Sequence, residues 1–356
     1  MASSYSKYKI FHFPKKIQSL KREAPNALPP IHIRIKPLNA CDHDCYYCAY
    51  RSSNLELGKD MNLKDLIPNK KMQEIIQDIS LMGVKSVTFS GGGEPLRYPY
   101  MLESLETLVK KKINFAIISN GSNLQGKLAD IISQHASWIR ISLDGWDAKS
   151  YANYRNVSLQ EFDKVIKNLE RFKQKSPRCK LSVNLIVNKD NAPHIEELVL
   201  KLKKIGIDNI KIGPCVISND HQKNYAYHQP IALQVKQSIV KLQKNHSSSN
   251  FELINGYNFT PIENMEKKYS WCPYVQVLPV IGADLMVYTC QDKAYTQKGV
   301  IGSIKDISFK EFWLNNKDKF YRITPSKDCH HNCVAHDKNK MLIDFLDISN
   351  EDVNFV

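Results

Sequence analysis

Three cysteines, Cys41, Cys45 and Cys48, stand near the start of the chain at the spacing C-x3-C-x2-C. Three thiolates can hold three irons of a cubane [4Fe-4S] cluster, whereas most iron-sulfur motifs supply a fourth cysteine nearby. Here the next cysteine along the chain is Cys179. A cluster held by three thiols leaves one iron open, and an open iron can bind a small molecule. The spacing therefore predicts a reactive iron-sulfur site.

Zinc is the alternative metal for this loop. Zinc takes four ligands in tetrahedral sites, and His43 could supply the fourth beside the three thiols. A disulfide framework is not expected, because nine cysteines in a large chain without a secretion signal favour metal or redox chemistry.

A glycine-rich loop, Ser90-Gly91-Gly92-Gly93-Glu94-Pro95, follows the second expected strand. Bare backbone lets a ligand approach closely, and a carboxylate beside it can accept hydrogen bonds from an ammonium group. Polar residues also close the third and fourth expected strands, where they could reach a ribose or a hydroxyl group: Ser119, Asn120, Ser142 and Asp144. On their own these residues fit ordinary turns equally well.

Taken with the cysteine loop, these stretches resemble the radical S-adenosylmethionine (radical SAM) superfamily. The resemblance implies that the open iron binds the amino and carboxylate groups of SAM. It also implies reductive cleavage of SAM to a 5'-deoxyadenosyl radical, which abstracts a hydrogen atom from an unactivated C–H bond.

The resemblance further implies which residues contact SAM. Tyr47 would lie against the adenine, and Gly92, Gly93 and Glu94 would meet the amino group. The ribose and carboxylate contacts would come from the ends of the third and fourth strands, through Ser119, Asn120, Ser142 and Asp144. Arg155, in the Tyr151 to Arg155 segment, would clamp the carboxylate, since an Arg fork suits a carboxylate bidentately.

The elements that must position these residues form repeated βα units. From Ile31 onward, short β-branched runs alternate with helical periodicity, which is the pattern of a parallel sheet. Six strands are expected, at 31–36, 84–90, 114–119, 138–143, 180–187 and 209–213. A capping box, Ser158-x-x-Glu161, predicts the start of the helix after the fourth strand. The pattern predicts an α/β fold, and six units agree with the open, TIM-like (βα)6 partial barrel that the resemblance implies. In such barrels the chemistry lies at the carboxyl ends of the strands.

Four further cysteines gather in the C-terminal part: Cys272, Cys290, Cys329 and Cys333. A hairpin is expected at 275–281 and 285–289, around Gly282, and a short helix at 309–314. This arrangement resembles the small α+β SPASM domain and its shortened twitch form, although the hairpin spacing after Gly282 is longer than usual. The resemblance implies one auxiliary [4Fe-4S] cluster held entirely by protein. Zinc is again the alternative, and His330, His331 or His336 could replace one thiol.

These patterns divide the chain into five expected segments. They are an N-terminal basic arm (1–30), the partial barrel (31–225), a connecting helix and linker (226–270), the auxiliary domain (271–338) and an acidic tail (339–356). The arm is too short for a winged-helix peptide-recognition domain, which counts against an enzyme that depends on a leader peptide.

The composition is that of a globular protein: 42% of the 356 residues are hydrophobic and 24% are charged. The sequence has neither a long apolar run nor a signal-peptide pattern, so we expect a cytoplasmic protein with no membrane partner. The net charge of +14 favours anionic ligands. Lysines are scattered and not interleaved with aromatic residues, so no nucleic-acid partner is predicted.

The sequence therefore predicts a radical SAM oxidoreductase or epimerase that acts on a small polar, anionic substrate. A sugar, a cyclitol or a nucleotide-linked sugar would fit, and a flavodoxin- or ferredoxin-type protein would supply electrons. Modification of a ribosomal peptide, by epimerisation or crosslinking, is the first alternative. A non-catalytic iron-sulfur or zinc protein is the second.

Two cysteines remain outside both clusters. Cys215 comes directly after the sixth strand and is expected to point near the substrate. A thiol there could return a hydrogen atom to a substrate radical, which would make the enzyme an epimerase, or it could simply pack as a small apolar residue. Without that donor, loss of an electron to the auxiliary cluster would make the enzyme a dehydrogenase. Cys179, at the start of a strand, is expected to be structural.

Overall fold

The computed structural model describes residues 6–52, 55, 57–175, 177–257, 266–331, 333–349 and 351–355. A single ten-stranded sheet runs through them in the order β10-β9-β8-β1-β2-β3-β4-β5-β6-β7. Its parallel part consists of β1 (His32–Ile35), β2 (Ser86–Phe89), β3 (Asn114–Ser119), β4 (Trp138–Ser142), β5 (Lys180–Val187), β6 (Asn209–Pro214) and β7 (Glu252–Asn255). The six predicted strands and the α/β partial barrel are confirmed.

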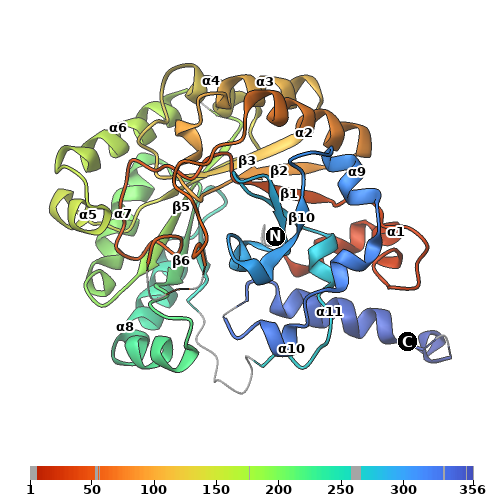
Figure 1. The fold of residues 1–356 in the computed structure, drawn as a ribbon. Helices are drawn as coiled ribbons and strands as arrows, with labels where there is room; N and C mark the ends of the chain where they lie inside the picture. The colour runs from red at the N-terminus through yellow and green to blue at the C-terminus, as the bar shows by residue number, and fades with distance from the viewer. Residues whose placement is uncertain are drawn as a thin grey trace.

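Helices cover the outer face of this parallel sheet in an arc (Figure 1). They are α2 (Asn69–Met82), α3 (Met101–Lys110), α4 (Gly126–His135), α5 (Ala148–Arg155), α6 (Gln160–Gln174), α7 (Ile195–Ile205) and α8 (His221–His246). Gly83 and Gly206 end α2 and α7 in the left-handed conformation that glycine adopts without strain.

Alternate residues of the parallel strands face opposite sides of the sheet. On β1, Ile33 and Ile35 are wholly buried in the main hydrophobic core beneath the helices. The residues between and beside them, His32, Arg34 and Lys36, therefore face the interior of the barrel. The same alternation holds for β4 and β6, so the barrel has an apolar outer layer and a polar interior.

The C-terminal part extends the same sheet past β1. Strand β8 (Val280–Ile281) pairs in parallel with β1, with Arg34 opposite Val280, and continues through β9 (Met286–Tyr288) to β10 (Val300–Ser303). Three helices complete this part: α9 (Phe309–Leu314), which packs on α2, α10 (Pro325–Asp328) and α11 (His336–Asp347). The C-terminal cysteines are thus attached directly to the first strand of the barrel.

The N-terminal segment lies beside α11 (Figure 1). Its elements are the 3-10 helix η1 (Lys7–His12) and α1 (Pro14–Gln18). A separate small core joins the two ends of the chain, through Ile10, Ile17, Leu20, Val277, Leu342 and Leu346. Other short 3-10 helices are η2 (Pro95–Arg97), η3 (Ala192–His194), η5 (Pro273–Gln276), η6 (Gln291–Lys293), η7 (Gln297–Gly299), η8 (Lys317–Tyr321) and η9 (Asp352–Asn354).

The region between barrel and auxiliary domain differs from the prediction. Helix α8 already begins at His221, because Asp220 caps it by accepting hydrogen bonds from Gln222 and Lys223. It is followed by β7, which pairs with β6 and so adds a seventh parallel strand. The predicted linker at 226–270 partly lies outside the described residues, at 258–265.

The expected hairpin is confirmed, because β8 pairs antiparallel with β9. Its first strand is shorter than predicted, since the 3-10 helix η5 runs from Pro273, which cannot donate to a strand ladder, to Gln276. The capping box before α6 does not form: the backbone of Ser158 accepts from Glu161 N, and the Glu161 side chain pairs with Lys164 instead. Helix α9, by contrast, occupies the predicted residues. Helix α11 runs across the expected boundary at 338, so the segment beyond it is not a separate tail.

The described residues include no helix long and apolar enough to cross a membrane.

Candidate active site at the carboxyl ends of the barrel strands

The three cysteines of the first motif lie together in the loop after β1, and all are partly buried. Burial raises the pKa of Cys41 to about 12 and also raises that of Cys45. A neighbouring thiol adds to each effect, Cys45 acting on Cys41 and Cys48 acting on Cys45. Three partly buried thiols within eight residues of one loop fit the donor set of an iron-sulfur cluster.

Polar residues between the cysteines fasten this loop to its neighbours. Asp42 accepts hydrogen bonds from the side-chain amides of Asn120 and Asn123, at 2.7 and 2.9 Å. His43 is buried and its Nε2 lies 3.0 Å from the Ser122 hydroxyl. These contacts join the cysteine loop to the loop after β3. The His43 Nε2 thus helps to hold the cysteine loop in place, whereas its Nδ1 is buried and has no hydrogen-bond partner among the described residues.

The glycine-rich loop runs alongside the chain that leads into Cys41. Gly93 N donates to Leu38 O and Glu94 N donates to Ala40 O, both at 3.0 Å. A Cβ on Gly93 would lie 1.9 Å from the Ala40 carbonyl oxygen, and only glycine permits this approach. The sequence predicted only a contact with SAM for Gly93. In the structure Gly93 also has a packing role, because its close contact with Ala40 sets the position of the cysteine loop.

Glu94 joins the ends of β2 and β3. Its carboxylate accepts hydrogen bonds from Ser119 Oγ and Asn120 N at 2.7 Å and from Leu96 N at 2.9 Å. Burial raises the pKa of Glu94 to about 7, although these hydrogen bonds act in the opposite direction. The carboxylate is therefore held rigidly, in a position set by three donors.

Arg155 joins the end of β4 to the cysteine loop. Its Nη2 donates to Asp144 Oδ1 at 2.5 Å, and its Nη1 lies 3.6 Å from Cys45 Sγ. The Tyr47 hydroxyl donates to the other oxygen of Asp144. Burial disfavours the charged guanidinium, but Asp144 overrides it, and the pKa of Arg155 lies above its ordinary value.

The structure thus brings most of the predicted site residues into one hydrogen-bonded assembly. Ser142 closes β4 at the same edge and is only partly buried. Cys215 also lies at this edge, directly after β6, and is buried. Burial and Asp144 raise the pKa of Cys215 to about 12, so its thiol keeps its hydrogen at neutral pH. Cys179 is buried in the main core next to the first residue of β5, at the opposite end of the barrel.

The four C-terminal cysteines line a single, largely apolar pocket together with Tyr269, Tyr274, Ile323 and His331. Burial raises the pKa of all four thiols. Asn339 of α11 donates to Cys272 Sγ at 3.2 Å. Four convergent sulfur atoms in an apolar pocket fit a metal cluster that is held entirely by protein.

Sequence reasoning missed two charged residues beside these sites, one wholly buried and one partly buried. Lys36, directly after β1, is wholly buried and donates to the Tyr50 hydroxyl and to the Gly91 carbonyl, in the cysteine and glycine loops. Asp292 lies beside His331 and Cys333, and the ligand atoms of these three residues all lie within 4.8 Å of one another. The sequence contained a signal for each of them. One was a lysine directly after a strand in which apolar and polar residues alternate, and the other was an acidic residue two positions after Cys290.

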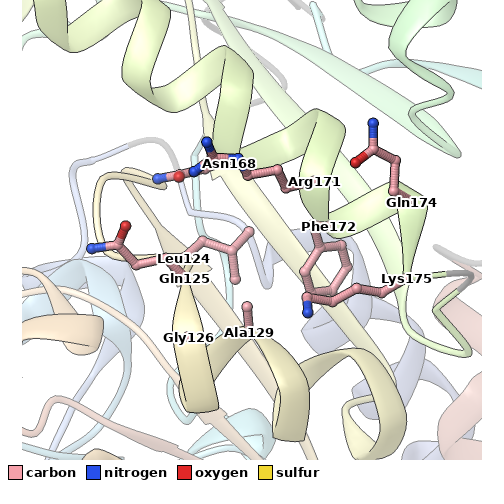
Figure 2. A pocket seen from close by; sticks show the side chains of 9 residues that line it. All are labelled: Leu124, Gln125, Gly126, Ala129, Asn168, Arg171, Phe172, Gln174 and Lys175. Carbon is pink, nitrogen blue, oxygen red and sulfur yellow. The ribbon is translucent and has the colours of Figure 1, made fainter.

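A pocket of about 680 Å³ lies elsewhere, between α4 and α6 on the outside of the barrel (Figure 2). Arg171 and Lys175 contribute its cationic groups, and Asn168 donates to the backbone of Gly121 and Ser122. None of the predicted SAM or metal residues lines it. Its size alone therefore does not make it the site of the chemistry.

Residues 35–202 match the model of the Radical SAM superfamily. Among curated proteins, the chain is 20% identical over 210 residues to the S-adenosylmethionine-dependent nucleotide dehydratase of Lacinutrix mariniflava, covering 57% of this chain and 42% of the relative. It is 25% identical over 141 residues to the GTP 3',8-cyclase of Synechococcus elongatus, covering 39% of this chain and 41% of that enzyme. The chain thus spans less than half the length of these two relatives.

Among solved structures, Streptococcus suis SuiB bound to the precursor peptide SuiA is similar, with a TM-score of 0.62 and 17% identity over 88% of this chain and 71% of that one. At this identity the likeness concerns the fold, which both chains share across the barrel and beyond it. The family match covers β1 to α7, and with them the cysteine loop, the glycine loop and the ends of β3 and β4. The chain therefore carries a Radical SAM domain at residues 35–202, just under half of its length.

Proposed function

We propose that this chain is an enzyme that cleaves SAM reductively and removes a hydrogen atom from a C–H bond of a small polar, anionic substrate. The observation that carries the proposal is the assembly at the strand ends. The loop with Cys41, Cys45 and Cys48 is joined by hydrogen bonds to the side chains predicted to hold SAM. A [4Fe-4S] cluster bound to these thiolates would supply the electron for SAM cleavage, and that chemistry belongs to the cofactor.

The chain's own residues would bind and orient SAM. Glu94 offers a fixed carboxylate for an ammonium group, and charge-assisted hydrogen bonds of this kind are among the strongest in proteins. Arg155 offers its Nε, which is buried and has no hydrogen-bond partner among the described residues. A carboxylate could accept from this group. Fixed donors and acceptors hold a substrate in a reactive geometry without further loss of entropy.

We further propose one auxiliary [4Fe-4S] cluster on Cys272, Cys290, Cys329 and Cys333. Sulfur atoms at 2.3 Å around a tetrahedral zinc lie about 3.8 Å from one another. Within the described part of the chain, only Asp292, His331 and Cys333 bring three ligand atoms within 4.8 Å of one another. The four cysteines line one largely apolar pocket, and this common pocket supports a cluster held by all four thiols.

Two observations support an anionic substrate over a peptide. The chain has a net charge of +14. The two curated relatives described above are named for reactions on nucleotides. Nucleotides and nucleotide-linked sugars carry phosphate groups, which a cationic protein attracts.

The fate of the substrate radical depends on what lies beside it, and the chain offers two possibilities. Cys215 carries a neutral, buried thiol near Asp144, and an S–H group there supports return of a hydrogen atom and hence epimerisation. An auxiliary cluster supports loss of a proton and an electron instead, which is oxidation by a dehydrogenase. A flavodoxin- or ferredoxin-type protein would supply the electron for SAM cleavage in both cases.

Iron content and SAM cleavage test the proposal together. Anaerobically reconstituted protein is expected to hold about eight irons per chain, because two cubane clusters contain four irons each. Replacing Cys41, Cys45 and Cys48 by Ala should leave about four irons and abolish reductive cleavage of SAM, measured as 5'-deoxyadenosine. Wild-type protein that binds eight irons but forms no 5'-deoxyadenosine with SAM and dithionite would contradict the enzymatic proposal. Zinc in place of the second group of irons would contradict the auxiliary cluster.

A further inference from the structure

Three strands of the barrel carry a cation between two isoleucines. The sequence reads Ile-Arg-Ile around Arg34 on β1, Ile-Arg-Ile around Arg140 on β4, and Ile-Lys-Ile around Lys211 on β6. All six isoleucines are wholly buried in the core beneath the helices. Because neighbouring residues of a strand face opposite sides, the three cations face the interior of the barrel.

The three cations are close enough to influence one another. Burial lowers the pKa of Arg34 and of Lys211, and Arg140 lowers both of them further. Lys338 of α11 also lowers the pKa of Lys211. Arg140 therefore lies within electrostatic reach of the other two, and the interior of the barrel collects positive charge from β1, β4, β6 and α11.

Arg34 lacks a partner that would compensate its charge. Its guanidinium forms no hydrogen bond or ion pair with any residue that the structure describes, and its Nε is buried. Asp292 and the Tyr50 hydroxyl are near enough to raise its pKa, but burial outweighs them and the pKa of Arg34 stays below its ordinary value. An unpaired buried cation beside other cations opposes folding. Arrangements that oppose folding are typical of binding sites whose ligand supplies the missing charge.

The position of the three cations inside the barrel suits a site for one end of a substrate molecule. Arg34, Arg140 and Lys211 each lie one to three residues before the last residue of their strand, which is Ile35 on β1, Ser142 on β4 and Pro214 on β6. Two residues of a strand span about 6 to 7 Å, so the cations lie one layer below the edge that carries Glu94 and Asp144. A substrate whose reactive carbon faces that edge would reach this layer with its other end.

We propose that Arg34, Arg140 and Lys211 form a subsite for a phosphate or diphosphate group of the substrate. The inference rests on the proposed function, because it concerns the same barrel opening. Phosphate fits better than a single carboxylate, since three cations match a multiply charged group and each guanidinium can donate two parallel hydrogen bonds to its oxygens.

Binding of inorganic pyrophosphate tests this subsite. The probe would be titrated by calorimetry into the iron-loaded protein under anaerobic conditions, with SAM at saturation so that the open iron is occupied. Arg34→Gln and Arg140→Gln should each weaken pyrophosphate binding by about tenfold or more, the loss expected when a charge-assisted contact is removed. Arg171→Gln is the matched control, because it makes the same change in the outer pocket between α4 and α6.

Several results would overturn the proposal. The first is that wild-type protein does not bind pyrophosphate at millimolar concentration. The second is that Arg34→Gln binds pyrophosphate as tightly as wild type. The third is that Arg171→Gln loses as much binding as Arg34→Gln. Acetate that competes as well as pyrophosphate would overturn the assignment to phosphate. A titration without SAM keeps the two proposals apart, because pyrophosphate binding there tests the subsite even if the protein fails to cleave SAM.

Stability gives a second readout that a purely structural arginine would not give. Without pyrophosphate, Arg34→Gln should unfold at the same or a higher urea concentration than wild type, because it removes an unpaired cation from the barrel. With pyrophosphate, the wild-type midpoint should rise and the variant midpoint should rise less. A lower midpoint for Arg34→Gln without ligand would show that Arg34 supports the fold, and it would contradict the proposal.

Discussion

Arg155 and Asp144 form a buried ion pair: Arg155 Nη2 lies 2.5 Å from Asp144 Oδ1, and the two side chains are 5% and 1% exposed. Asp144 follows β4, whereas Arg155 ends α5 and also lies against Cys45. The pair therefore ties a strand end of the barrel to the cysteine loop. Residues predicted to contact SAM are at the same time the supports of the metal site.

Removing one partner of this pair should destabilise the protein strongly. Arg155→Ala leaves Asp144 as an uncompensated buried charge, which typically costs about 3 to 5 kcal/mol. Asp144→Asn removes that charge, so the double variant should lose less stability than the sum of the single losses. Urea unfolding of the four proteins measures this coupling. Additive losses would show that the pair is not coupled. SAM binding should also weaken in Arg155→Ala while the C-terminal thiols keep their metal.

Gly93→Ala should disturb the cysteine loop. The new Cβ would meet the Ala40 carbonyl at 1.9 Å, so the glycine loop and the chain leading to Cys41 must move apart. We expect this variant to lose iron from the first site and to hold only about four irons per chain. Gly213→Ala is the control at another strand end, because a Cβ there meets nothing within 4 Å. Equal iron content in both variants would refute the packing role of Gly93.

The pH dependence of stability should show the raised pKa of Glu94. Its folded-state pKa is about 7, against an ordinary value of 4.5 in the unfolded chain. Between these values the folded protein keeps a proton that the unfolded chain has lost. The unfolding free energy should therefore fall as pH rises from 4.5 to 7, by roughly 3 kcal/mol from this group.

Glu94→Gln isolates this contribution. The variant is expected to be less stable at every pH, because its amide cannot accept from all the donors around Glu94. Its difference from wild type should shrink as pH rises towards 7, when the wild-type carboxyl ionises. Urea midpoints over this pH range measure the difference, and parallel profiles for the two proteins would contradict the buried, proton-binding carboxyl.

The source of the returned hydrogen distinguishes the two fates of the substrate radical. If Cys215 donates it, turnover in D2O should place solvent deuterium at the inverted carbon, and Cys215→Ala should abolish this labelling. Mass spectrometry of the product measures the label. Undiminished formation of an oxidised product by Cys215→Ala would exclude the donor role.

The strands and the two cysteine groups could be predicted because their signals are local. Short β-branched runs separated by helical periodicity located all six strands within two or three residues. Strand β7 was missed because it is short and is defined by its pairing with β6. The first strand of the hairpin is shorter than predicted, because Pro273, a residue without an N–H, starts a 3-10 helix that runs to Gln276.

The cations inside the barrel were missed although the sequence contained their signal. Strands buried on both faces read as continuous apolar runs, whereas β1, β4 and β6 alternate strictly between isoleucine and polar residues. Such alternation indicates a polar interior. The positive charge was instead interpreted as lysines scattered over solvent-facing surfaces, because only the curved sheet of the folded protein places Arg34, Arg140 and Lys211 on one inner face.

The pairing of β1 with β8 also has a consequence for synthesis on the ribosome. One edge of β1 can pair with β2 soon after both have been translated, but its other edge must wait for Val280 and Ile281, near the far end of the chain. Until then the nascent barrel exposes the N–H and C=O groups of an open edge, which can pair with another unfinished chain. Cells are therefore expected to need chaperones for this protein until its last quarter, which contains Val280 and Ile281, has been translated.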